Sequence, residues 1–285
     1  MRVLKLTADK SFEGKKASAL LTHMGCSREI IKMLKNGGLL INGSPAFTVQ
    51  LLKENDVVEL VFPDEISSAV PKEIDRVEIV YSDEDIAVVN KPPDLPIHQS
   101  VGHYDDTLAN HFAAVFPNCA FRAVTRLDRN TSGLCVVALN KLSAAIMCQN
   151  RPQKLYYAIC QGITPPSGTI NSPIKREHES MMKRIVSPDG QTAETDFRTF
   201  GHYGNKSFLE VSLKTGRTHQ IRVHLAYIGH PLLGDDLYGG DRSEIGRHAL
   251  HCGYVKLIHP ITKKVIEFKC GIPKDMEQCL NISSN

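Results

Sequence analysis

The sequence predicts an α+β fold: a large domain built on a mixed, mostly antiparallel β-sheet flanked by helices and loops, preceded by a small α+β domain. Strand patterns outnumber helical ones, and the two do not alternate regularly as they do in a doubly wound fold. Residues 1–62 contain nine basic residues (Lys or Arg) and six acidic ones (Asp or Glu). Residues 63–101 contain three basic and nine acidic residues, and residues 102–285 contain 22 basic and 16 acidic residues. An acidic connector therefore separates two basic modules. This distribution fits a polyanionic partner, although charge alone favours an ordinary solvated surface.

Residues 1–62 are predicted to form two helices followed by hairpin-like strands. Apolar residues at positions 17, 20, 21 and 24 have helical spacing. Ser27 stands where it can cap a second helix, which the Gly37-Gly38 pair ends. "LLING" predicts a short strand closed by an Asn-Gly turn, and "LKENDVVELVF" predicts a turn and an alternating strand. The spacing of three basic side chains places them on one face of the second helix: Arg28, Lys32 and Lys35.

Residues 63–76 are acidic and contain Pro, Ser and Ala, which is typical of a linker. Residues 77–285 form the large domain, whose first strand pattern begins at the end of the linker. We expect strands within 76–92, 133–140, 154–162, 208–215, 249–260 and 263–270, and helices within 106–116, 141–150 and 218–229. The domain organisation expected is therefore 1–62, 63–76 and 77–285.

Composition excludes several classes of protein. No stretch approaches the roughly 18 apolar residues that a membrane span needs, and the first 14 residues lack the apolar core of a signal peptide. None of the eight cysteines forms a C-x-x-C pair, which argues against a zinc ribbon. We expect a cytoplasmic protein with free thiols.

Four stretches can carry chemistry. In "RLDRNTSG", Asp128 lies close to Arg126 and Arg129 and precedes a turn into an apolar strand; on this spacing alone, a structural ion pair is favoured over catalysis. "NKPPDLPIHQS" is a proline-stiffened loop after a strand. "KLYYAICQG" places two tyrosines on opposite faces of one strand, so one of them can line a cavity. The fourth stretch, residues 213–240, is dense in donors that suit phosphate: Arg217, His219, Gln220, Arg222 and His224.

These motifs, in this order, resemble the RluA family of RNA pseudouridine synthases. The resemblance rests on "RLDRNTSG", "KLYYAICQG" and "KTGRTHQIRVHLAYIGHPLLGDDLYG", with "DEDIAVVNKPPDLPIH" similar to the segment that opens the family's catalytic domain. Residues 1–62 resemble the alpha-L RNA-binding motif that many members carry N-terminal to the catalytic domain. The match covers nearly the whole chain and implies the pseudouridine synthase fold.

The resemblance implies an isomerase that converts uridine in RNA to pseudouridine without cofactor, nucleotide or metal. The family's catalytic aspartate falls on Asp128, its active-site tyrosine on Tyr156 and its aspartate-pairing arginine on Arg222. The target uracil must leave the base stack, and Tyr156 offers an aromatic face for it. The remaining basic residues are expected to bind RNA: Arg126, Arg129, Arg217 and His219 in the catalytic domain, and Arg28, Lys32 and Lys35 in the N-terminal domain.

One position departs from the family pattern, since Thr125 stands where a histidine usually precedes "RLD". A threonine side chain can neither stack on a base nor change its charge near neutral pH, which affects how this loop contacts RNA. We expect a monomer acting on large-subunit ribosomal RNA, with transfer RNA as the alternative target. Two other hypotheses are an RNA-binding or ribosome-assembly factor without chemistry, and a metal-dependent hydrolase using Asp235, Asp236, His219 and His224.

Overall fold

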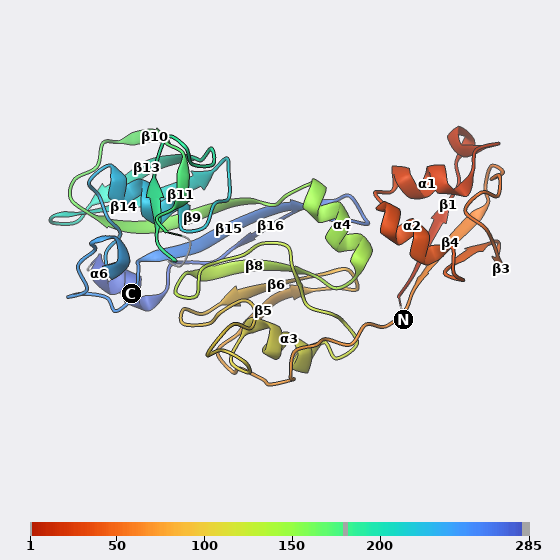
Figure 1. Cartoon of the computed structure of the whole chain (residues 1–285), viewed down its shortest axis with the longest axis horizontal. Helices are drawn as coiled ribbons and strands as arrows, with labels where there is room; N and C mark the ends of the chain where they lie inside the picture. Colours follow the sequence, from red (N-terminus) through yellow and green to blue (C-terminus); the bar gives the residue numbers. More distant parts are fainter. Residues whose placement is uncertain (1, 179–181, 281–285) are drawn as a thin grey trace.

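The computed structural model describes residues 2–178 and 182–280. Within these ranges the strands form a four-stranded sheet near the N-terminus, a ten-stranded sheet and a two-stranded hairpin (Figure 1). The predicted α+β class and the predicted small N-terminal unit are both confirmed. No helix in the described ranges has the length and apolar character needed to cross a bilayer.

The N-terminal sheet is entirely antiparallel, with strand order β1-β4-β2-β3. Its elements are β1 (Arg2–Thr7), η1 (Lys10–Phe12), α1 (Ala17–His23), α2 (Arg28–Leu34), β2 (Leu39–Ile41), β3 (Ser44–Pro45) and β4 (Val57–Phe62). The Ser27 hydroxyl accepts from the Ile30 amide, as the sequence predicts for an N-cap. Asn42 and Gly43 both have positive φ, 52° and 77°, as a two-residue hairpin turn requires. Strand β1 was not expected.

The large sheet has the order β10-β13-β14-β9-β15-β8-β6-β5, with β16 added to β15 and β7 to β8. All of its pairings are antiparallel except that of β8 with β15, so the predicted mixed, mostly antiparallel sheet is confirmed. The strands of this sheet and the hairpin β11–β12 are β5 (Glu78–Ser82), β6 (Ile86–Lys91), β7 (Arg122–Ala123), β8 (Ser132–Ala138), β9 (Gln153–Gln161), β10 (Ser167–Asn171), β11 (Ile174–Arg176), β12 (Arg184–Val186), β13 (Glu194–His202), β14 (Lys206–Leu213), β15 (Leu250–Ile258) and β16 (Val265–Lys269).

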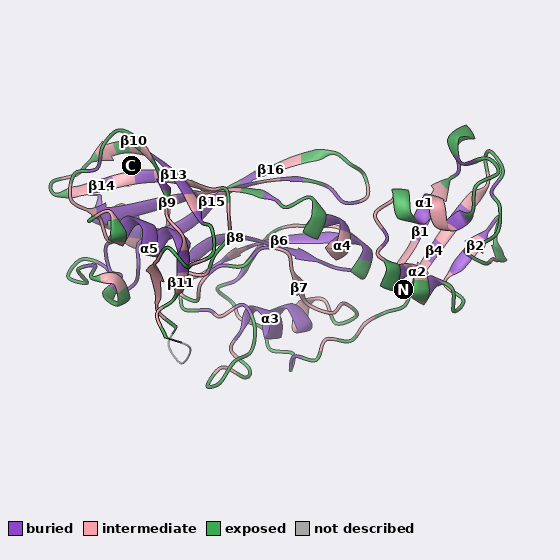
Figure 2. Ribbon diagram, turned by 45° about the horizontal axis from the view of Figure 1, so that its top comes forward, coloured by how far each residue is buried: buried purple, intermediate pink, exposed green. Residues whose placement is uncertain are grey.

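The predicted helices of this part form as α3 (Leu108–Val115), α4 (Lys141–Gln149) and α5 (Gln220–Tyr227). The structure adds α6 (Lys274–Cys279) and the short η2 (Asp236–Tyr238), which were not expected. Strands β6 and β8, neighbours on the β5 side of the sheet, are almost completely buried, while exposed residues gather in the surrounding loops (Figure 2).

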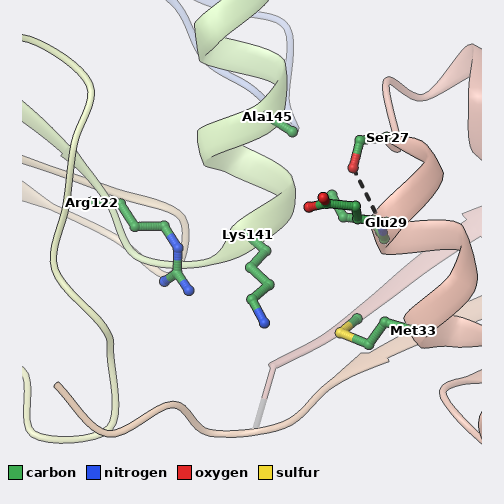
Figure 3. Close-up of a pocket in the computed structure, with 7 residues that line it drawn as sticks. Ser27, Glu29, Met33, Arg122, Lys141 and Ala145 are labelled. Atoms are coloured by element: carbon green, nitrogen blue, oxygen red, sulfur yellow. Dashed lines mark hydrogen bonds between the residues drawn. The ribbon is translucent and has the colours of Figure 1, made fainter. Parts of the chain in front are cut away.

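Helix α4 joins the two parts of the chain. Leu142 and Ile146 belong to the apolar core of the N-terminal unit. Ile146 packs on Gly25, where a side chain would come within 2.8 Å of the Ile146 Cγ1. Arg2 of β1 adds an ion pair to the buried Asp85, at 3.0 Å. Beside these contacts, a crevice of about 240 Å³ separates α2 from α4 and is lined by Ser27, Glu29, Ile30, Met33, Arg122, Lys141 and Ala145 (Figure 3).

The expected linker, residues 63–76, contains no helix or strand. It nevertheless lies along α3, because the Lys72 amide donates to the Asn110 carbonyl and the Ile74 amide to the His111 ring. Ala69 is buried against the same helix. The connector is therefore bound to the large domain along its second half.

Truncating Ile146 tests whether α4 carries the N-terminal unit. Ile146→Ala is expected to lower the free energy of unfolding by about 2–5 kcal/mol, since it opens a cavity in a shared core. Denaturant unfolding measures this. The matched control is Cys148→Ala, an exposed position on the same helix, which should change little. Equal stability of the two variants would contradict the packing of Ile146 into the shared core.

Candidate active site

The "RLDRNTSG" segment forms a loop between β7 and β8. It enters the sheet where β8 pairs with β15 in parallel, with Ser132 opposite His251 and Gly133 opposite Cys252. Gly133 has φ of 111°, and a side chain there would collide with the backbone of Cys252. Only glycine meets both conditions, so the Thr-Ser-Gly turn fixes how the Asp128 loop leaves the sheet.

Buried cations hold the carbonyl groups of this loop. The Lys91 ammonium is fully buried and donates to the carbonyls of Arg129 (2.9 Å), Pro92 (2.9 Å) and Leu95 (3.0 Å). Burial lowers the pKa of Lys91 to about 7, while its three acceptors bind the charged form. The Asn130 carbonyl accepts from the guanidinium of Arg247 at 3.2 Å. The backbone of the two residues that directly follow Asp128 is therefore held by buried basic side chains.

Two buried histidines hold the turn. His248 Nε2 lies 2.8 Å from the Thr131 hydroxyl, and His251 Nδ1 lies 2.9 Å from the Ser132 hydroxyl. Burial lowers the pKa of His248 to about 2 and that of His251 to about 4. Both rings are thus neutral near neutral pH, and they act as hydrogen-bond partners, not as charges.

Arg222 lies between two carboxylates. Its Nε and Nη2 each donate to the buried Asp235 at 2.7 Å, and its Nη1 lies 3.3 Å from Oδ2 of Asp128. Burial alone would lower the pKa of Arg222, but the neighbouring carboxylates outweigh burial and the pKa is raised. The side chain of Asp128 is 28% exposed, against 0% for Asp235. One side of the Asp128 carboxylate therefore faces the fixed Arg222 guanidinium, and the other side is open to solvent.

Tyr156 lies on β9, on the face of the sheet that α5 covers. It is buried, its ring lies 5.3 Å from the Lys154 ammonium, and burial raises its pKa to about 12. Tyr157 faces the other side, near Phe200 and Phe208. The predicted division of the two tyrosines is confirmed.

The residues expected to bind RNA fall into two groups. Around Asp128, the side chains of Arg126, Arg129 and Arg217 are exposed, although Arg129 also pairs with Asp94 at 2.6 Å. His219 is nearly buried, and its Nε2 lies 3.8 Å from Oδ2 of Asp128. The second group is exposed on and just after α2: Arg28, Lys32 and Lys35.

Thr125 points inward. Its hydroxyl accepts from the Val136 amide at 2.9 Å and lies against the sulfur of Cys135. It is 5% exposed. A side chain in this position braces the loop against β8 and does not reach toward a substrate.

The four residues of the metal-hydrolase hypothesis do not converge. Arg222 occupies both oxygens of Asp235, His224 bonds Thr195 and the Ser172 carbonyl, and Asp236 is exposed and paired with Arg242. In the described ranges, the one group with three possible ligand atoms within 4.8 Å is Asp83, Asp85 and His259. Its carboxylates already bind Arg2, Tyr81 and Asn140.

Sequence reasoning missed several residues of this site: Lys91, Tyr238, Arg247, His248 and His251. The signal available for most of them was a basic residue within or beside an apolar strand, as in "VVNKPP" and "GRHALHC". Asp235 was expected only to help shape the core.

A family model described as RNA pseudouridylate synthase matches residues 85–227. The chain is 37% identical over 269 residues to YjbO, an uncharacterized RNA pseudouridine synthase of Bacillus subtilis, covering 90% of this chain and 95% of that protein. It is 35% identical over 246 residues to the ribosomal large subunit pseudouridine synthase D of Haemophilus influenzae, covering 79% and 76%. Among solved structures, human RNA pseudouridylate synthase domain containing 1 matches with a TM-score of 0.58 and 30% identity, covering 70% and 85%.

The fold and these matches define an RNA-modifying isomerase. The chain belongs to the RluA family of RNA pseudouridine synthases, as its motifs indicated. Its N-terminal sheet and helix pair are consistent with the alpha-L RNA-binding motif.

Removing the charge of Asp235 tests the buried pair. Asp235→Asn leaves the Arg222 guanidinium without its bidentate partner, which is expected to lower the free energy of unfolding by about 3–5 kcal/mol and to reduce pseudouridine formation sharply. Thermal unfolding and an activity assay on RNA measure the two effects. Asp236→Asn, next in sequence but exposed, is the control, and equal behaviour of the two variants would rule out this role.

Proposed function

We propose that this enzyme converts specific uridines of large-subunit ribosomal RNA to pseudouridine, with Asp128 as the catalytic group. The observation that carries the proposal is the half-open Asp128 carboxylate beside a fixed Arg222. Relatives named ribosomal large subunit pseudouridine synthase D, at 35–37% identity, support the ribosomal target. The N-terminal basic helix α2 supports binding to structured RNA.

The reaction requires the bond between ribose C1′ and N1 to break and a bond between C1′ and C5 to form. N1 gains a proton and C5 loses one, so nothing is added overall and no cofactor is called for. Asp128 acts on the ribose, and both attack on the sugar and removal of a sugar proton need an ionised carboxylate. Arg222 places a fixed positive charge 3.3 Å from that carboxylate. Tyr156 presents its ring to the extruded uracil.

The basic residues around the site have separate tasks in this proposal. Arg126 and Arg129 reach phosphates or the space left by the flipped base, and Arg217 binds the backbone on the α5 side. Arg28, Lys32 and Lys35 hold a second part of the RNA. We further propose that the enzyme acts in the cytoplasm as a monomer.

Pseudouridine mapping tests the function. Total RNA is compared between cells with and without the gene, complemented by wild type, by Asp128→Asn or by the control Asp189→Asn, which alters an exposed carboxylate. We expect one or more ribosomal RNA marks to depend on the gene and to return with wild type and the control. The Asp128→Asn substitution should reduce the rate by at least about 10³-fold, as loss of a covalent or base catalyst does.

Each other outcome is informative. A gene-dependent mark on transfer RNA would overturn the ribosomal target. A mark restored by Asp128→Asn would show that Asp128 is not the catalyst. If no mark changed, binding without chemistry would become the leading account.

A further inference from the structure

His219 has an unusual backbone. It is the N-cap of α5 with φ of 57° and ψ of 17°, in the left-handed region that residues other than glycine seldom adopt. Backbone conformations of this kind persist where the surroundings enforce them, and they cluster at functional sites. The side chain is 10% exposed and lies beside Asp128.

Hydrogen bonds to Tyr238 fix the protonation of the His219 ring. The Arg184 amide donates to the Tyr238 hydroxyl oxygen at 2.9 Å, and this oxygen lies 3.0 Å from Nδ1 of His219. Across the described residues, Nδ1 is the one acceptor placed to receive the phenolic proton. Burial lowers the pKa of His219, so the ring is neutral. A neutral imidazole that accepts at Nδ1 carries its proton on Nε2.

That Nε2–H faces the catalytic carboxylate. It lies 3.8 Å from Oδ2 of Asp128, the same oxygen that Nη1 of Arg222 approaches at 3.3 Å. Hydrogen bonds of catalytic groups are often long before substrate binds and shorten in the complex. Two donors therefore converge on Oδ2, which leaves Oδ1 for the ribose.

Tyr238 connects the two donors. Its ring stands edge-on to His219, with centroids 5.8 Å apart, and the Arg222 guanidinium carbon lies 5.0 Å from its centroid. The hydroxyl sets the tautomer of His219 while the ring packs against Arg222. Replacing Tyr238 by Phe keeps the ring and removes only the hydroxyl.

We propose that His219, with its tautomer set by Tyr238, is a positioning residue that donates to Oδ2 of Asp128 and turns Oδ1 toward the ribose. This replaces the sequence-based expectation that His219 binds RNA. The inference rests on the proposed function of Asp128, and it assigns Tyr238 a role that the sequence motifs did not suggest.

Steady-state kinetics on ribosomal RNA transcripts test the proposal with three variants: Tyr238→Phe, His219→Asn and the double variant. Asparagine tolerates the left-handed backbone, so His219→Asn retains the fold while removing the imidazole. We expect kcat to fall about 10–100-fold in each single variant, with KM within about twofold of wild type, as for a group that acts in the transition state. The double variant should lose no more than His219→Asn alone. Tyr254→Phe, a partly exposed tyrosine of β15, is the control.

A higher KM with unchanged kcat would assign His219 to RNA binding and overturn the proposal, as would additive losses in the double variant. Wild type and Asp128→Asn run in the same assay report separately on the proposed function. ¹⁵N NMR of the histidine rings in the free protein needs no activity: the proton of His219 should lie on Nε2 in wild type. An Nδ1–H tautomer there would overturn the proposal by itself.

Discussion

The site depends on one buried cation held between two carboxylates. Arg222 lies on the first turn of α5, and Asp235 fixes its guanidinium with two bonds of 2.7 Å. A bidentate arginine is rigid, so its remaining nitrogen presents a positive charge to Asp128 at a set position. Asp235 thus accepts two of the hydrogen bonds that the Arg222 guanidinium donates. The side chain of Asp128 is 28% exposed, so it stays accessible to substrate. Neither carboxylate can take the role of the other, because their exposure differs.

The aspartate loop is fixed before any RNA arrives. The parallel pairing of β8 with β15 brings Gly133 against Cys252, and buried Lys91 and Arg247 bind the carbonyls of the two residues that follow Asp128. A loop that is already held in place presents its carboxylate without reorganisation when the substrate arrives. In the proposed function, the exposed arginines around the loop follow the RNA while the carboxylate stays where it is.

The sequence was sufficient for elements with a clear apolar pattern. Strands β6, β8, β9 and β15 read as apolar runs because both faces are buried or nearly so. Strand β13, "ETDFRTFGH", was missed because several of its side chains face solvent. Strand β1 was missed because its partner, β4, lies some 50 residues away in sequence, and helix α6 is too short to show a period.

The sequence likewise predicted only part of the active site. The motifs indicated Asp128, Tyr156 and Arg222, and the structure brings Asp128 and Arg222 together although they are 94 residues apart. A basic residue beside an apolar strand marked Lys91 and His248, but the sequence assigned no role to them or to Tyr238, because those roles depend on which carbonyls and hydroxyls the fold places beside them. Asp235 was visible in sequence, but its bond to Arg222 was not.

The most direct test of the account is the rate of tritium release from RNA labelled at uridine C5, measured with Arg222→Lys. Lysine retains the positive charge but cannot bind Asp235 with two nitrogens and reach Asp128 with a third. We predict a fall of at least about 10²-fold relative to wild type, the scale of losing one preorganised donor. A variant that released tritium at the wild-type rate would show that charge alone suffices, and would contradict the central role of the fixed arginine.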